Sequence, residues 1–163
     1  MASASAQADT RTLNLPDGRS IRYDVRAADA GSPTSALGTA RRILRHLAAG
    51  ELDEAAALSN APKRRFEVLR DYQDRVGAEE FKRVFARLAK VEDGNVAEVA
   101  IGPHRLLVWD VPGADRQLAA QYYVDVEGRF LMDEVPSDTR GELARILRTW
   151  REERAARPSG GKD

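Results

Sequence analysis

The chain has 163 residues, enough for one hydrophobic core and too few for two ordinary domains. Its 26 basic and 26 acidic residues cancel, so it lacks the basic excess that nucleic-acid-binding domains usually carry. It contains no cysteine, which excludes disulfides, thiol catalysis and thiolate metal sites, and no apolar run of about 18 residues that would span a membrane.

The segment from Ala2 to Asp9 resembles the small-residue end of a secretory signal. Ala6-Gln7-Ala8 fits the small-residue pattern that precedes a cleavage site, although the charged and apolar parts of a signal are missing. We therefore expect residues 1–11 to be a disordered signal remnant or tag and the protein to be periplasmic or secreted. The alternative is an Ala- and Ser-rich N-terminus of a cytoplasmic protein.

A β-hairpin is predicted for residues 12–25, where Leu13 and Leu15 alternate with polar residues before the turn Pro16-Asp17-Gly18-Arg19. A helical period of apolar residues then begins after Thr34 or Ser35, either of which can cap a helix. Gly50 ends this first helix, and Gly77 favours a break between the third and the fourth. The helices following the first are predicted at 51–58, 63–76 and 78–89.

After residue 90 the period changes to that of strands, and the tight turn Glu127-Gly128 joins the last two. The four strands are predicted at 96–101, 105–111, 118–126 and 129–135. A C-terminal helix starts at residues 137–139, where Thr139 to Glu142 has the form of a capping box, and residues 157–163 read as a disordered tail. Residues 12–156 thus form one α+β domain, in which helices pack on a curved, cone-like antiparallel meander with an N-terminal hairpin and an added C-terminal helix.

This arrangement resembles the nuclear transport factor 2-like superfamily, which includes the SnoaL-type polyketide cyclases. The resemblance is carried by the segment Ala48-Ala49-Gly50-Glu51-Leu52 with the Ala/Leu run that follows it, by the two helices after it, and by the meander from Val96 to Val135. It implies a pocket between sheet and helices. It does not imply a reaction, because this fold hosts enzymes, binding modules and assembly domains.

Motifs for chemistry are missing from the chain: there is no phosphate loop, dinucleotide turn, metal-ligand spacing or nucleophile elbow. His46 lies off the apolar stripe of its helix and reads as a solvated side chain, and His104 reads as a loop residue. We therefore expect no catalytic set, no metal and no cofactor.

One polar cluster is predicted in the meander. The Glu127-Gly128 turn pairs Tyr122 with Asp133, and a loop joining residues 111 and 116 places Arg105 opposite Tyr122, with Trp109 alongside. Arg105, Trp109, Tyr122 and Asp133 are thus the candidate ligand-binding residues, and a structural salt bridge is the competing interpretation. A shift of one residue would bring His104 to Asp133 as an acid–base pair.

Three functions remain open. The first is a non-catalytic protein-interaction module of an exported bacterial protein, with an immunity-type or envelope-assembly role. The second is a SnoaL-like small-molecule-binding protein or acid–base enzyme. The third is a homodimer formed through an outer sheet face, whose candidate residues are His104, Leu106, Val108, Tyr123, Phe130 and Met132.

Overall fold

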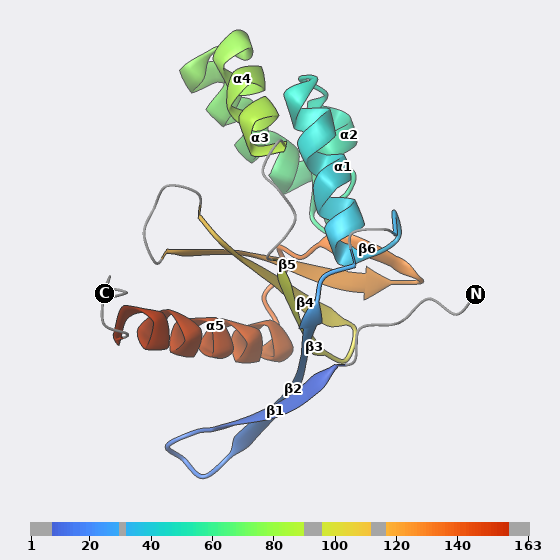
Figure 1. Cartoon of the computed structure of the whole chain (residues 1–163). Coiled ribbons are helices and arrows are strands. Elements are labelled where there is room, and N and C mark those ends of the chain that lie inside the picture. The colour runs from blue at the N-terminus through green and yellow to red at the C-terminus, as the bar shows by residue number, and fades with distance from the viewer. Residues whose placement is uncertain (1–7, 30–31, 90–95, 112–116, 157–163) are drawn as a thin grey trace, which may run out of the picture.

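The computed structural model of the protein describes residues 8–29, 32–89, 96–111 and 117–156. One antiparallel sheet contains β1 (Asp9–Asn14), β2 (Ser20–Ala27), β3 (Ala97–Ile101), β4 (His104–Asp110), β5 (Leu118–Val126) and β6 (Arg129–Met132), paired in chain order. The helices of the described segments are α1 (Ala36–Ala48), α2 (Leu52–Ala56), α3 (Pro62–Val76), α4 (Ala78–Ala89) and α5 (Asp138–Ala156). The predicted α+β class, with helices on a curved antiparallel meander, is confirmed (Figure 1).

The N-terminal hairpin forms where its turn chemistry predicts it. Gly18 has a φ of 89°, and the Asp17 carboxylate accepts a hydrogen bond of 2.9 Å from the backbone N–H of Arg19. The first strand begins at Asp9, inside the segment 1–11 that was predicted to be disordered, so the domain boundary moves to that residue. Residues 1–7 and 157–163 lie outside the described residues.

Local signals set the helix boundaries. The Ser35 side chain caps α1 by accepting a 3.0 Å hydrogen bond from the Gly38 N–H. Gly77 has a φ of 90°, which separates α3 from α4 as predicted. At α5 the cap is Ser137, whose side chain accepts from the Arg140 N–H at 3.1 Å, so the capping box predicted at Thr139 is wrong by two residues.

Helices cover both faces of the sheet (Figure 1). On one face, α1 packs over the sheet, and α2, α3 and α4 pack against α1 and one another, so that one core cluster joins these helices to Leu107, Tyr123 and Met132. On the other, Leu143, Ile146 and Leu147 of α5 pack against residues of five strands, from Leu13 of β1 to Tyr122 of β5. The sheet therefore curves around α5, which makes this helix a core element of the fold.

The β6 edge of the sheet is closed by the chain itself. The connection between α2 and α3 runs parallel to β6 and forms a bridge from Ser59 to Met132. The Met132 N–H donates to the Leu58 carbonyl at 2.8 Å, and the Asn60 N–H donates to the Met132 carbonyl at 3.0 Å. On β6 the Phe130 carbonyl also accepts the Thr39 hydroxyl, at 2.8 Å. These bonds occupy main-chain groups that an edge strand would otherwise expose.

Candidate functional site

The four predicted ligand-binding residues divide between the two faces of the sheet. Leu106, not Arg105, lies opposite Tyr122, because β4 and β5 pair one residue out of the predicted register. Since neighbouring side chains on a strand alternate, this shift turns Arg105 and Trp109 toward the α1–α4 face and leaves Tyr122 and Asp133 on the α5 face. The predicted pairing of β5 with β6 is confirmed, and the Asp133 N–H donates to the Tyr122 carbonyl at 2.8 Å.

The Asp133 carboxylate is the centre of a buried polar network. Its side chain is 3% exposed, and it accepts hydrogen bonds from the Asn60 side-chain amide at 2.8 Å and the Val135 N–H at 3.2 Å. His104 Nδ1 lies 3.4 Å from the other carboxylate oxygen, and this nitrogen can donate to it in the appropriate tautomer. The side-chain Oδ1 of Asn60 in turn accepts a hydrogen bond of 2.8 Å from the Glu134 backbone N–H. The network ties the α2–α3 connection to the end of β6.

His104 and Asp133 thus meet, as the alternative acid–base pair required, although the register that was to bring them together is wrong. In the observed register His104 pairs with Val124, and its side chain reaches Asp133 from two strands away. Most of the bonding capacity of Asp133 serves Asn60 and the backbone. This arrangement matches a satisfied buried carboxylate as well as an acid–base pair.

A second buried carboxylate, Glu98, was not predicted from the sequence. It is 4% exposed and lies on β3 between two arginines, with its Oε2 2.6 Å from Arg26 Nε and 3.7 Å from Arg105 Nε. Burial lowers the pKa of Arg105. Its guanidinium also lies over the Phe130 ring, with Cζ 5.3 Å from the ring centroid. A charged residue within an apolar strand was the available signal, but its nearer partner, Arg26, comes from a strand 72 residues away in the sequence.

The outer sheet face proposed for a homodimer does not exist as predicted. Leu106 and Val108 are buried under α5, with exposures of 0% and 3%. Tyr123 and Met132 are buried under α1 to α4, with exposures of 2% and 5%. The error arises because residues of both faces were assigned to one face.

A shallow groove of about 230 Å³ lies where the C-terminal half of α5 meets one end of the sheet. Its lining includes Trp150 and Glu153 of α5 and Trp109 and Asp110 of β4. Asp110 forms an ion pair of 2.7 Å with Arg154. Tyr122 and Asp133 are not among its lining residues. Its volume is below the range of about 300–1,000 Å³ that is usual for small-molecule pockets.

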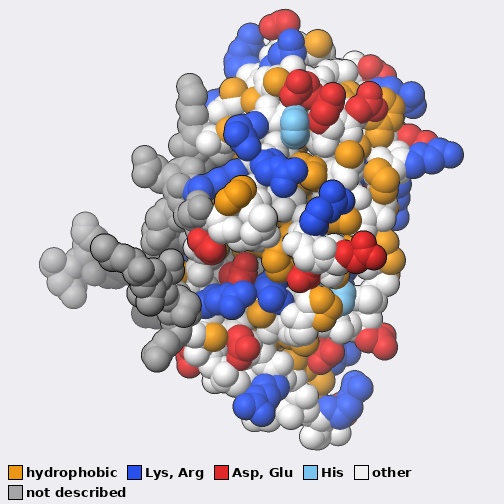
Figure 2. Space-filling view, turned by 90° about the vertical axis from the view of Figure 1, so that its right-hand side faces the viewer, with side chains coloured by type: hydrophobic (Ala, Val, Ile, Leu, Met, Phe, Trp, Pro, Cys, Tyr) orange, Lys and Arg blue, Asp and Glu red, His pale blue; other side chains and the backbone are white. Residues whose placement is uncertain are grey.

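The surface offers no large apolar patch in the described part of the chain. The exposed large hydrophobic residues lie on different elements, with Val68 on α3, Leu88 on α4, Val126 on β5 and Val135 after β6. On the face shown in Figure 2, basic and acidic side chains are interspersed and hydrophobic side chains form small separate groups. Isolated hydrophobic residues of this kind are normal on a protein surface.

The described residues contain neither a metal-ligand cluster nor a helix that could span a membrane. Within residues 8–29, 32–89, 96–111 and 117–156, no group of three or more His, Asp or Glu side chains is arranged to hold a metal ion. None of the helices described there is both long enough and apolar enough to cross a bilayer.

Comparison with known proteins gave no match: no family model, no curated protein and no solved structure matches this chain. The resemblance to the nuclear transport factor 2-like superfamily therefore stays a prediction.

Proposed function

We propose that this chain is a non-catalytic protein-interaction module of an exported bacterial protein, with an immunity-type or envelope-assembly role. The polar residues that suggested a ligand site are divided between two sheet faces, and the buried carboxylates Asp133 and Glu98 are bonded within the fold. Export is supported by the signal-like Ala6-Gln7-Ala8. The module acts by accepting an extended segment of a protein partner at the β1 edge of its sheet.

The open β1 edge carries this proposal. In the part of the chain that the structure describes, β1 pairs with β2 alone, and none of the backbone hydrogen bonds outside regular strand pairing involves residues 9–14. The β6 edge, in contrast, is occupied by the Leu58–Asn60 segment. Natural sheets usually protect an edge, and here only one of the two is protected by the chain itself.

The hairpin register identifies the free main-chain groups. The Leu15 N–H donates a 2.8 Å hydrogen bond to the Arg19 carbonyl, so the main-chain groups of Leu15 point toward β2. In an antiparallel pair the bonding direction alternates from residue to residue. Thr10, Thr12 and Asn14 therefore direct their N–H and C=O groups away from β2, toward the open side.

Photo-crosslinking in the source cells tests the proposal. Benzoylphenylalanine is placed at Thr10 on the β1 edge or at Glu67, an exposed residue of α3, as the control. We expect discrete protein adducts from the edge position alone, and we expect their loss when Thr12→Pro is added, because proline removes an outward-facing donor without disturbing a bond to β2. Equal labelling at both positions, or no protein adduct at Thr10, refutes the proposal.

The approach of His104 to Asp133 favours the SnoaL-like small-molecule-binding protein or acid–base enzyme as the second candidate. In it, His104 would exchange the proton and Asp133 would orient the imidazole. Native mass spectrometry after incubation with an extract of the source cells tests this candidate. A bound small molecule that His104→Gln abolishes supports it, whereas an unliganded protein, or a ligand that the variant retains, rejects it.

A further inference from the structure

We infer that the segment that completes the β1 edge is the β1 strand of a second copy of this chain, paired antiparallel about a two-fold axis at Thr12. The inference rests on the proposed function, whose partner it names. It differs from the homodimer predicted from the sequence, because it uses a sheet edge and not a sheet face. Pairing two such edges joins the six-stranded sheets of both copies.

Hydrogen-bond geometry limits the registers that a symmetric pair can adopt. Outward-directed residues must face outward-directed residues, so the axis falls on a residue of β1 itself. Only an axis at Thr12 uses all three outward residues, with Thr12 opposite Thr12 and Thr10 opposite Asn14. An axis at Arg11 or at Leu13 leaves part of the strand unpaired, and the former also sets two arginines against each other.

The charges on β1 are compatible with the Thr12 axis. It places Arg11 of each copy opposite Leu13 of the other, so the aliphatic part of the arginine can cover an apolar side chain. Arg11 also keeps its 2.8 Å ion pair with Asp9, and the hydrogen bond that it donates to that carboxylate raises the pKa of Arg11. The strand therefore presents no unpaired charge to its copy.

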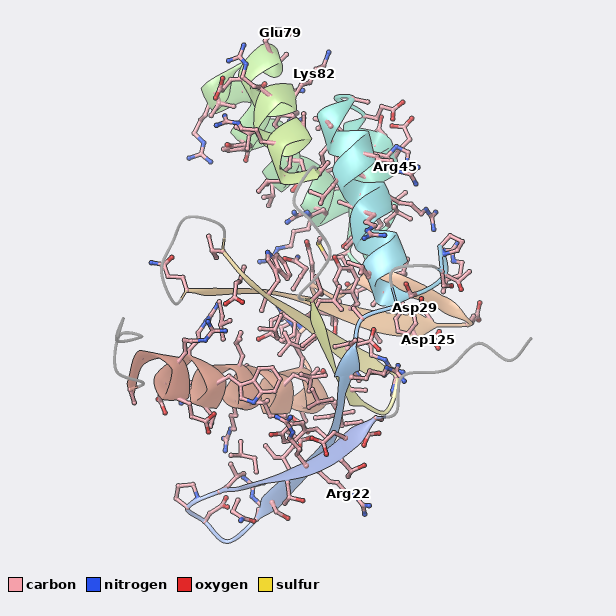
Figure 3. All side chains as sticks on the ribbon, viewed as in Figure 1. Arg22, Asp29, Arg45, Glu79, Lys82 and Asp125 are labelled. Carbon is pink, nitrogen blue, oxygen red and sulfur yellow. The ribbon has the colours of Figure 1, made fainter. Side chains whose placement is uncertain are left out.

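The other face of β1 also tolerates the pairing. Thr12 faces Thr12 of the other copy there, and opposed threonines are favourable cross-strand neighbours, while Thr10 faces the polar Asn14. Arg22 pairs with Thr12 inside each copy and extends on the side of the hairpin away from α5 (Figure 3). In the dimer the two Arg22 side chains are three strand spacings apart, about 15 Å, which exceeds the screening length of about 8 Å at physiological salt.

The contact is made mainly by main-chain groups, so it belongs to the weak, transient class of interfaces. We expect the full chain to be monomeric at about 10 µM and largely dimeric at about 1 mM, as the small edge contact implies. Sedimentation velocity over this range measures the change. Thr12→Pro is expected to stay monomeric at the highest concentration, with circular dichroism verifying that it folds.

Because the chain has no cysteine, single cysteines report the register without competing thiols. Residues in a hydrogen-bonded pair have Cα atoms about 5.5 Å apart, within disulfide range, so Thr12→Cys is expected to form a covalent dimer on mild oxidation. Thr10→Cys is the matched control on the same edge, and Arg22→Cys is the control on the inner strand. Both controls are expected to cross-link at least ten-fold more slowly.

Each outcome decides the inference. A wild-type protein that stays monomeric at 1 mM, or a Thr10→Cys variant that cross-links as fast as Thr12→Cys, overturns it. If the protein is monomeric while photo-adducts at Thr10 contain a different protein, the inference fails and the proposed function stands. If no adduct forms at Thr10 in cells and the purified protein is monomeric, both fail.

Discussion

Removing the Asn60 side chain tests whether the α2–α3 connection is held to the sheet by the Asp133 network. Asn60→Ala deletes a hydrogen bond to a buried carboxylate, which contributes about 1.5–3 kcal/mol. It also leaves the Glu134 N–H without its acceptor, which costs about 1–3 kcal/mol. Asn60 is half-buried, so water reaches part of the site, and we expect a combined loss of about 2.5–4 kcal/mol.

Urea unfolding followed by circular dichroism measures this loss, and the m-value is expected to remain unchanged because the buried surface barely changes. Asn14→Ala is the matched control: Asn14 is exposed on β1, and its replacement is expected to stay within about 0.5 kcal/mol of the wild type. A double-mutant cycle with Asp133→Ala isolates the pair, and we expect a coupling energy of about 0.5–3 kcal/mol. A loss below about 1 kcal/mol for Asn60→Ala, or a coupling energy near zero, refutes the reasoning.

Three further predictions concern single positions. In α1, a Cβ at Gly38 would lie 2.7 Å from the Pro33 backbone, so Gly38→Ala is expected to destabilise the protein. In α5, a Cβ at Gly141 meets open space, so Gly141→Ala is expected to stabilise the protein by about 0.5–1 kcal/mol. Equal urea midpoints for the two variants contradict this prediction. Burial raises the pKa of Tyr123 well above its usual value of about 10, so the stability that this neutral phenol contributes is present below pH 10 and lost above it; Tyr123→Phe is expected to weaken the alkaline loss of stability measured by urea unfolding at pH 8 and pH 11. Hydrogen bonds from the Arg19 backbone and side chain lower the pKa of Asp17, so its contribution to stability is present above the unfolded pKa and lost as pH falls through the folded value; an NMR titration is expected to show a partial rise of this pKa in Arg19→Ala, and no rise would reject the assignment.

Local signals in the sequence were sufficient for the elements and for one register. Ser35 caps α1 and Gly77 separates α3 from α4 because capping and left-handed backbone depend on residues close by in the chain. The pairing of Val126 with Arg129 follows from a two-residue turn whose residues Glu127 and Gly128 both have positive φ. A short turn leaves a hairpin no freedom of register.

The candidate site was predicted only in part, because it depends on the pairing of β4 with β5. Residues 111–117 separate these strands in the sequence, too many for a two-residue turn to fix the register, and an error of one residue moved Arg105 and Trp109 to the other face. Asn60 shows the same difficulty. In the sequence it reads as part of a helix break before Pro62, and only the folded chain brings it to Asp133.

The sequence by itself thus determined the order and type of the elements, the break at Gly77 and the tight turns, since these depend on periodicity and on neighbouring residues. Only the tertiary structure decided which side chains share a sheet face, that α5 fills the concave side, and that β6 is covered while β1 is open. The physical reason is that side-chain direction reverses at every residue of a strand. Contacts between distant strands therefore depend on a register that no local interaction specifies.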